Sequence, residues 1–244
     1  MAEREIALIC GVGPEKGMGA QLCHRFSKAG LYVVASGRTE SDLQEVVNSV
    51  EKSGGDASYF VADATSEKDT AELFNYCKTI GCLNLAIYNA GNNTPGRILD
   101  ISPAYFKESW KVCCFGGFLF GQAATKLFIS QATGGTLIFT GASASLRGRE
   151  NFGAFNSSKA ALRAFAQALA KEHGKDDIHV GHVVIDGAIN GEKIHTRYPE
   201  FAKEMGSGGL LNLSSIVDVY EFLWKQPKSG WSFEIDCRTN VESW

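Results

Sequence analysis

The most constraining feature of this sequence is a regular alternation between short apolar runs of strand character and longer segments of helical period. The strand-like runs lie at 5–10, 31–36, 57–62, 83–88, 136–140 and 178–185. Strands that are apolar along their whole length are buried on both faces, and parallel strands need long crossovers, usually helices, to join them. The alternation therefore predicts an α/β fold with a doubly wound parallel sheet of Rossmann type, in three α/β/α layers.

The segments between these runs set the predicted domain organisation. Leu22 and Phe26 share one face of a helix that follows a glycine turn, and Gly30 supplies its left-handed stop. Residues 187–212 are rich in charge and glycine without clear periodicity, which is typical of a substrate lid. We predict a single domain over the whole chain (1–244), with this lid inside it. Further helices are expected at 39–53, 66–80, 103–131, 152–173 and 214–224, and a last strand at 231–237.

Composition and charge favour a small-molecule partner. The net charge is −3 without blocks of one sign, so neither nucleic acid nor a membrane is expected as a partner. The apolar run at 6–10 is too short for a signal-peptide core or a membrane span, which favours a cytoplasmic protein. The seven cysteines form no Cys-x-x-Cys pair, and no histidine lies at metal-ligand spacing from a pair. Reduced thiols and no metal site are therefore expected.

Three glycines follow the first predicted strand at the spacing Gly13-x-x-x-Gly17-x-Gly19. Between a strand and a helix the chain must turn sharply, and glycines let the backbone approach a diphosphate without side-chain obstruction. The amides at the start of the following helix then point at the negative charge. A plain tight turn is the alternative, but the position after the first strand of an α/β chain favours nucleotide binding.

Several other residues match one family pattern together with this glycine spacing. They are Asp63 after the third strand, Asn89-Ala90-Gly91 after the fourth, Lys159 in a long helix and Asp186-Gly187 after the sixth. In combination the sequence resembles the short-chain dehydrogenase/reductase family over about residues 5–240, although Tyr88 and Asp186 replace an Asn and a Pro of the family pattern. The resemblance implies a nicotinamide dinucleotide held by Gly13, Lys16, Gly17, Met18, Gly19, Arg38, Asp63, Ala64, Asn89, Gly91, Lys159 and the backbone of Ile189.

The choice of cofactor follows from the charge at the end of the second strand. NAD enzymes place an acidic residue there to bind the ribose hydroxyls, whereas the 2′-phosphate of NADP needs a cation. Here the residues are Gly37 and Arg38, and Lys16 in the glycine turn is a second cation. Glu15 weakens this positive field, and both cations could be ordinary solvated charges. We expect NADP(H), with NAD(H) as the less favoured cofactor.

The usual catalytic groups of the family are missing. The resemblance implies four catalytic residues. A Tyr gives a proton to the substrate oxygen, a Ser donates a second hydrogen bond to it, a Lys lowers the pKa of the Tyr, and an Asn holds a water that relays protons. Aligning on Lys159 places Phe155 at the Tyr, and the family's spacing back from there places Ala142 at the Ser. The landmark Trp110-Lys111-Val112 places Cys113 at the Asn. None of the seven tyrosines has a Lys four residues later, so the alignment has no alternative. Lys159 is then the one catalytic residue retained, and neither a phenyl ring nor a methyl group supplies a proton.

Five residues are candidate substitutes for the missing acid: Ser143, Ser157, Ser158, His195 and Tyr198. Serines after a strand or in a helix usually hydrogen-bond to backbone, which makes local structure the simpler interpretation for the first three. The other two lie in the predicted lid, and a closing lid can bring a donor to a substrate.

Two functions remain open from the sequence. The first is an NADP(H)-dependent oxidoreductase acting on a small carbonyl or alcohol, because the positioned hydride can sustain some rate without the usual acid. The second is a catalytically silent NADP(H)-binding sensor or interaction protein, and a structural α/β domain without a ligand is a third. The family resemblance also implies a homodimer or homotetramer through the long fourth and fifth helices. The apolar stretches at 115–120 and 160–170 are compatible with such contacts, and burial in the core explains them equally well.

Overall fold

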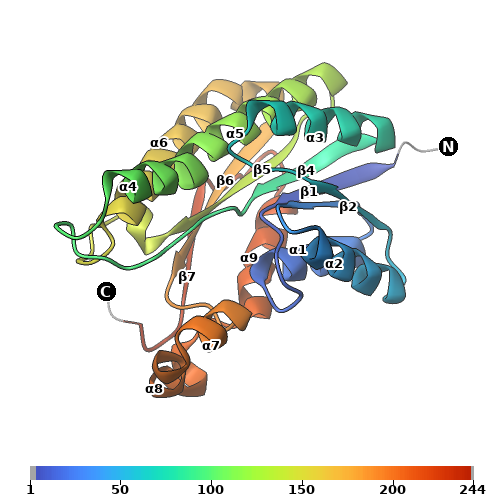
Figure 1. Ribbon diagram of the computed structural model, residues 1–244. Coiled ribbons are helices and arrows are strands. Elements are labelled where there is room, and N and C mark those ends of the chain that lie inside the picture. Colours follow the sequence, from blue (N-terminus) through green and yellow to red (C-terminus); the bar gives the residue numbers. More distant parts are fainter. Residues whose placement is uncertain (1–3, 243–244) are drawn as a thin grey trace.

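Seven strands of the computed structural model, which describes residues 4–242, pair in one parallel sheet of order β3-β2-β1-β4-β5-β6-β7 (Figure 1). The order reverses between β1 and β4, where doubly wound sheets bind their ligands at the carboxyl ends of the strands. The predicted parallel fold is therefore confirmed. The strands are β1 (Glu5–Cys10), β2 (Tyr32–Gly37), β3 (Ala57–Val61), β4 (Cys82–Tyr88), β5 (Gly135–Ala142), β6 (Ile178–Asp186) and β7 (Glu234–Arg238).

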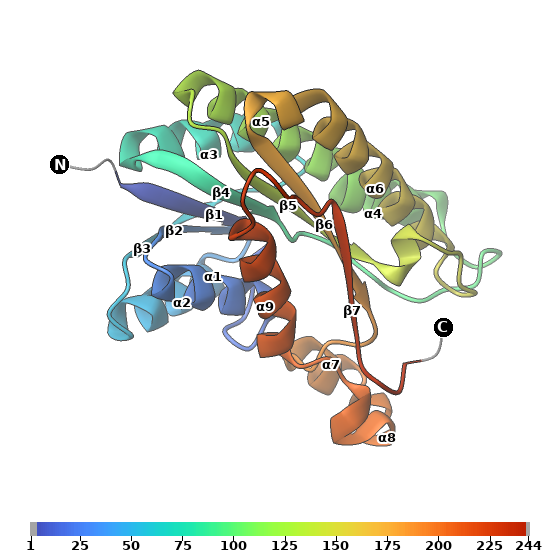
Figure 2. The ribbon, with the colours of Figure 1, turned by 180° about the vertical axis from the view of Figure 1, so that it is seen from behind.

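Helices cover both faces of the sheet (Figures 1 and 2). One face carries α1 (Met18–Lys28), α2 (Glu40–Lys52) and α9 (Leu213–Trp224); the other carries α3 (Glu67–Ile80), α4 (Pro103–Trp110), α5 (Gly116–Gln131) and α6 (Gly153–His173). Successive residues of β1 point to opposite faces, so Ile9 joins the core under α1 and Leu8 the core under α5. This explains why its whole length is apolar.

Most helix boundaries follow the signals in the sequence. Gly30 has a φ of 95° directly after α1, as its left-handed stop requires, and the Ser66 hydroxyl accepts a hydrogen bond from the Asp69 amide at the start of α3. Thr39 precedes α2, but its side chain makes no capping hydrogen bond. The helix expected over 103–131 is continuous but widens into a π-helical turn at Lys111–Phe115. Such turns are frequent at functional sites.

The helical segment Pro103–Gln131 is also long and apolar enough to cross a membrane, judged by length and composition alone. Inside the fold, 56% of its most apolar stretch is buried, and a core helix passes the same test.

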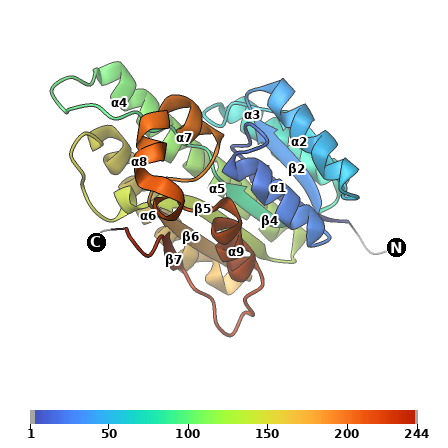
Figure 3. The same ribbon diagram turned by 90° about the horizontal axis from the view of Figure 1, so that it is seen from below.

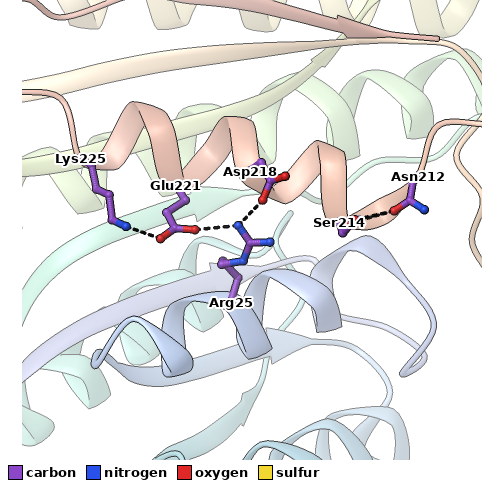
Figure 4. Close-up of polar contacts among 6 residues, drawn as sticks. All are labelled: Arg25, Asn212, Ser214, Asp218, Glu221 and Lys225. Atoms are coloured by element: carbon purple, nitrogen blue, oxygen red, sulfur yellow. Dashed lines mark hydrogen bonds and ion pairs between the residues drawn. The ribbon is translucent and has the colours of Figure 1, made fainter.

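Polar side chains hold α9 against α1 (Figure 4). Arg25 of α1 donates to Asp218 at 2.5 Å and to Glu221 at 2.7 Å, and the second oxygen of Glu221 accepts from Lys225 at 2.5 Å. The Asn212 side chain caps α9 by accepting from the Ser214 amide at 2.8 Å. These contacts fix the helix that follows the predicted lid.

The segment predicted as an irregular lid, 187–212, contains two short helices, α7 (Glu192–Arg197) and α8 (Pro199–Gly209), which pack side by side (Figure 3). Both ends of the segment are tied at one point, because Ile189 and Leu211 form a β-bridge and the Leu211 amide donates to the Ala188 carbonyl at 2.8 Å. The helices lie beyond the carboxyl ends of the strands (Figure 1). Their action as a substrate lid stays a prediction.

Candidate functional site

The glycine turn after β1 packs tightly except at one position. A Cβ atom on Gly19 would lie 2.6 Å from the Gly11 carbonyl oxygen, and one on Gly11 would lie 2.4 Å from the Ala90 nitrogen. A Cβ on Gly13 would meet nothing within 4 Å. The turn thus presses against α1 and the end of β4, while open space lies above Gly13, where a diphosphate needs backbone free of side chains.

Gly11 was not among the residues predicted from the sequence. Its φ of 97° lies in the left-handed region, and the spacing that points to the nucleotide begins only at Gly13. A glycine directly after the last apolar residue of β1 was the available signal.

Two predicted cofactor residues stand exposed at the end of β2 and in the glycine turn. Arg38 and Lys16 are both exposed and form no ion pair with any residue of 4–242. Gly37, before Arg38, must be glycine because a Cβ there would lie 2.3 Å from the Val12 carbonyl oxygen of the turn. The end of β2 therefore lies against the glycine turn, and a phosphate near one is near the other.

The Glu15 charge that opposes these cations is already engaged. One carboxylate oxygen of Glu15 lies 2.6 Å from the His24 ring nitrogen and accepts from the Ser49 hydroxyl at 2.8 Å. Since these partners belong to α1 and α2, the carboxylate is held between those helices. The second carboxylate oxygen is buried and has no hydrogen-bond partner within residues 4–242.

The predicted residues after β3 and β4 shape the floor of the site. The Asn89 side chain donates to the Gly11 carbonyl at 3.0 Å and accepts from the Thr140 hydroxyl at 3.1 Å, so it joins the ends of β1, β4 and β5. Asp63 is exposed and its carboxylate accepts from the amide and hydroxyl of Thr65, both at 2.9 Å. Ala64, the next residue, is half-buried, and Met18 at the start of α1 is buried.

Tyr88, which departs from the family pattern, is fully buried beneath the π-helical turn. Its hydroxyl donates to the Val112 carbonyl at 2.6 Å, and burial raises the Tyr88 pKa well above its ordinary value. A Cβ on Gly116 would lie 2.3 Å from that hydroxyl. The ring therefore needs the glycine at the start of α5, and its hydroxyl satisfies a carbonyl within the π-helical turn.

Three of the four predicted catalytic positions meet at one point of the cleft. A Cβ on Gly91 would lie 3.6 Å from the Lys159 ammonium and 3.9 Å from the Cys113 sulfur. The ammonium also lies 5.7 Å from the centre of the Phe155 ring. Lys159 is 3% exposed and donates to the Thr140 carbonyl at 2.7 Å, and its burial lowers its pKa. The buried charge is hydrogen-bonded and faces an aromatic ring.

Cys113 and Ala142 offer little polar chemistry. Cys113 lies in the π-helical turn with its sulfur 3.7 Å from both the carbonyl oxygen and the side-chain oxygen of Asn92. Ala142 ends β5, and its amide donates to the Ser145 hydroxyl at 3.2 Å. The roles assigned to these positions from the family pattern stay predictions.

The candidate substitutes for the missing acid have other partners or face solvent. The Ser157 and Ser158 hydroxyls donate to carbonyls of their own helix, Gly153 at 3.0 Å and Ala154 at 2.6 Å, so these serines are structural as expected. Tyr198 is exposed and Ser143 is half-buried.

His195 lines a hollow beside the glycine turn. Its ring nitrogen is 2.7 Å from the Asn190 side-chain oxygen. Its side chain lines a hollow of about 620 Å³ together with Lys16 and Gln21. This hollow lies beside the glycine turn, and Ile189 stands at the base of the segment that forms its other wall.

An ion-pair cluster that the sequence did not predict lies at the end of β6. Asp186 is 2% exposed, and one guanidinium nitrogen of Arg147 lies 3.1 and 3.2 Å from its two oxygens. Arg238 of β7 approaches the same carboxylate at 3.3 Å. These contacts fix the loop after β5 to the end of the sheet. The available signal was an acidic residue at the end of an apolar run.

A second unpredicted cluster is centred on His182 in the middle of β6. Its ring is fully buried, with one nitrogen 2.9 Å from Glu234 of β7 and the other 3.4 Å from the Ser145 hydroxyl. Arg163 of α6 holds both oxygens of Glu234 and lowers the Glu234 pKa. Burial lowers the His182 pKa to about 4, so the imidazole is neutral near pH 7.

Because His182 is buried and neutral in the folded protein, we expect the protein to lose stability in acid. Between pH 6.5 and about 4 the unfolded chain binds a proton at His182 that the folded chain refuses, so stability falls as the pH falls through that window. From pH 7 to pH 4.5 the His182 contribution to this loss is about 2–3 kcal/mol. Urea unfolding of the wild type and of His182→Gln at both pH values measures it. Equal losses in the two proteins would contradict the assignment.

The fold and the glycine turn define a doubly wound α/β protein of the dinucleotide-binding class. The sequence profile described as short chain dehydrogenase matches residues 5–196. The chain belongs to the short-chain dehydrogenase family.

Individual relatives agree with this membership. Trihydroxynaphthalene reductase PfmaI of Pestalotiopsis fici is 27% identical over 225 residues, which make up 91% of this chain and 76% of that protein. The crystal structure of a short-chain dehydrogenase from Rhodopseudomonas palustris is 30% identical, with a TM-score of 0.81 over 96% of this chain and 98% of that one. A variant of actinorhodin polyketide ketoreductase, solved with NADPH, shares the fold at 17% identity, with a TM-score of 0.88 over 99% and 98%.

Proposed function

We propose that this protein binds NADP(H) and transfers a hydride between its nicotinamide and a small carbonyl or alcohol. The observation that carries the proposal is the glycine turn, which is closed against Ala90 and Gly11 but open above Gly13. The exposed cations Lys16 and Arg38 lie in the glycine turn and directly after β2, respectively. The actinorhodin ketoreductase, which has the same fold, was solved with NADPH, and this supports the choice of cofactor.

The residues present suit each part of such a cofactor. Free amides at the start of α1 suit the diphosphate, and the two cations suit a 2′-phosphate. The Asp63 carboxylate is accessible for the adenine, and the backbone of Ile189 suits the carboxamide. When bound, the nicotinamide supplies or accepts the hydride. Lys159 would orient the nicotinamide ribose while its ammonium, fixed by Thr140, keeps positive charge beside the reacting oxygen.

A catalytically silent NADP(H)-binding protein is the second candidate function. It is favoured by the absence of a proton-donating side chain at Phe155 and Ala142, and by the Thr140 carbonyl that already accepts from Lys159. Both functions include binding of NADPH. They differ in turnover, because only the oxidoreductase oxidises NADPH when a suitable carbonyl compound is present. A broad panel of carbonyl compounds tests this, with the loss of absorbance of the reduced nicotinamide as the readout.

The choice of NADP(H) over NAD(H) is tested by reversing one charge. Arg38→Glu should weaken NADPH binding about 10–100-fold, because a hydrogen bond between charged groups contributes about 1.5–3 kcal/mol. NADH affinity should stay the same or rise, since an acidic residue there suits the ribose hydroxyls. Fluorescence titration with each cofactor measures both effects. Lys52→Glu at the end of α2 gives the same change in net charge as a control. An unchanged NADPH affinity in Arg38→Glu would contradict the assignment.

A further inference from the structure

The side chains of Ser145, His182 and Glu234 lie next to one another on the α6 side of β6, outside the proposed dinucleotide site. The Ser145 hydroxyl, in the short 3-10 turn Ser143–Ser145 after β5, lies 3.4 Å from one ring nitrogen of His182. The other ring nitrogen lies 2.9 Å from a carboxylate oxygen of Glu234. A hydroxyl, an imidazole and a carboxylate in this order are the groups of a nucleophile, its base and the group that orients the base.

The hydrogen-bond partners determine where the protons lie. An ionised Glu234 accepts only, so the His182 nitrogen facing it, Nδ1, carries the hydrogen. Since burial keeps the ring neutral, Nε2 is then an acceptor. The Ser145 oxygen already accepts from the Ala142 amide at 3.2 Å, which leaves its own hydrogen for Nε2. This is the tautomer that a general base needs.

The surrounding backbone and ion pairs fix the three groups in place. Arg163 donates to both oxygens of Glu234, at 2.5 and 2.9 Å, and Glu234 is the direct cross-strand neighbour of His182. A Cβ on Gly141 would lie 2.2 Å from the His182 Nε2, so β5 leaves room for the ring only because it has a glycine there. The imidazole therefore has little freedom to turn away from Ser145.

Ser145 also lines a cavity with features of a ligand site. The cavity, of about 270 Å³, lies between the turn after β5 and α6, and Ala144, Leu146 and Ala160 give it apolar walls. Asn156 lines it as well; it is 8% exposed, and its side-chain oxygen has no partner within residues 4–242. A buried acceptor without a partner is costly and points to a ligand that donates to it.

A positive charge stands at the same cavity. Arg147 lines it and is 44% exposed, and its contact with Asp186 uses a single nitrogen of the guanidinium. This contact holds the Arg147 side chain in place and leaves other N–H groups of its guanidinium available for a second acceptor. A guanidinium two residues from the hydroxyl is suited to the negative charge that develops on a carbonyl oxygen under attack.

We propose that Ser145, His182 and Glu234 form a second active site, which hydrolyses small esters. As the Ser145 oxygen bonds to the ester carbonyl carbon, His182 Nε2 takes the hydroxyl proton and Arg147 faces the oxyanion. The bond to the leaving alcohol then breaks, and the alcohol oxygen takes the proton from Nε2. A water molecule then gives a proton to Nε2 as its oxygen bonds to the acyl carbon. The bond to the Ser145 oxygen breaks, this oxygen takes the proton back from Nε2, and the carboxylic acid is released. The small volume of the cavity, about 270 Å³, suits an ester with a short acyl chain.

The nucleophile is tested on the full-length protein with diisopropyl fluorophosphate, which phosphorylates activated serines. Intact mass and peptide mapping should show one adduct per chain, on Ser145. Ser145→Ala should abolish the adduct, and His182→Gln should slow its formation at least about 100-fold, because general-base assistance contributes about 10²–10⁴-fold. Ser157→Ala, in the same cavity, is the matched control and should label as the wild type does.

Hydrolysis of p-nitrophenyl acetate by the same proteins is the second readout. The proposal predicts turnover that falls about 100-fold or more in Ser145→Ala and in His182→Gln, and that falls again as the acyl chain lengthens beyond the cavity. Thermal unfolding of each variant confirms that it is folded. Because neither assay contains a dinucleotide, its outcome does not depend on NADPH binding. Absence of an adduct on Ser145, or His182→Gln labelling as fast as the wild type, overturns the proposal.

Discussion

Restoring a phenol at position 155 and a hydroxyl at position 142 is expected to raise NADPH-dependent carbonyl reduction by about 10²–10⁴-fold. Hydride transfer to a carbonyl leaves negative charge on oxygen, and a positioned acid contributes a factor of this size. The setting for such an acid is in place. The Lys159 ammonium lies 5.7 Å from the centre of the Phe155 ring and is buried, so it would lower the pKa of a phenol there.

The experiment compares Phe155→Tyr, Ala142→Ser and the double variant on one carbonyl panel at saturating NADPH. The double variant should exceed either single one, because such residues act as a unit and their effects do not simply multiply. Phe152→Tyr, one turn earlier along the chain, adds the same hydroxyl away from Lys159 and should change nothing. A double variant that binds NADPH as the wild type does but gains no rate would contradict the assignment of these two positions.

Gly11→Ala is expected to lower the free energy of unfolding by about 2–6 kcal/mol. A φ of 97° is unfavourable for alanine, and strained backbone of this kind costs about 1–3 kcal/mol. The new methyl group would also lie 2.4 Å from the Ala90 nitrogen, and overpacking costs a further 1–3 kcal/mol, roughly. The atoms that the methyl group would meet are backbone atoms of Asn89 and Ala90, which cannot turn away as a flexible side chain could.

Gly13→Ala is the matched control, two residues away in the same turn. Its methyl group meets nothing within 4 Å, so the free energy of unfolding should stay within about 0.5 kcal/mol of the wild type. The methyl group would enter the space proposed for the diphosphate, and NADPH affinity should fall at least about tenfold. Urea unfolding and NADPH titration of both variants separate the two effects. Equal stability of Gly11→Ala and Gly13→Ala would refute the packing account.

Most of the fold could be predicted because its signals are local. The residues of β6 are buried throughout, and an apolar run of that kind between helical segments indicates a central parallel strand. The two helices in 187–212 were missed because one has six residues and the other contains Gly206 with a non-helical φ of 62°, too short and too irregular for a period to emerge. The π-helical turn was missed because no local pattern marks it. The Tyr88 hydroxyl that donates to the Val112 carbonyl in this turn lies 24 residues away in the sequence.

The candidate site was predictable where a residue directly follows a strand or matches the family pattern. Gly13 and Asn89 come after the ends of β1 and β4, and Lys159 matches the family pattern in a long helix. The contact between Arg147 and Asp186 spans 39 residues, and that between His182 and Glu234 spans 52. Both depend on the register of β5, β6 and β7, which no local pattern encodes. The sequence therefore predicts where a nucleotide would bind but not which polar groups stand beside that place.

Titration calorimetry of the wild-type protein with NADPH and with NADH tests the central claim most directly. The account predicts one NADPH bound per chain, at least about tenfold tighter than NADH, with the difference removed in Arg38→Glu. Absence of a binding signal with either dinucleotide, from protein shown to be folded, would contradict it.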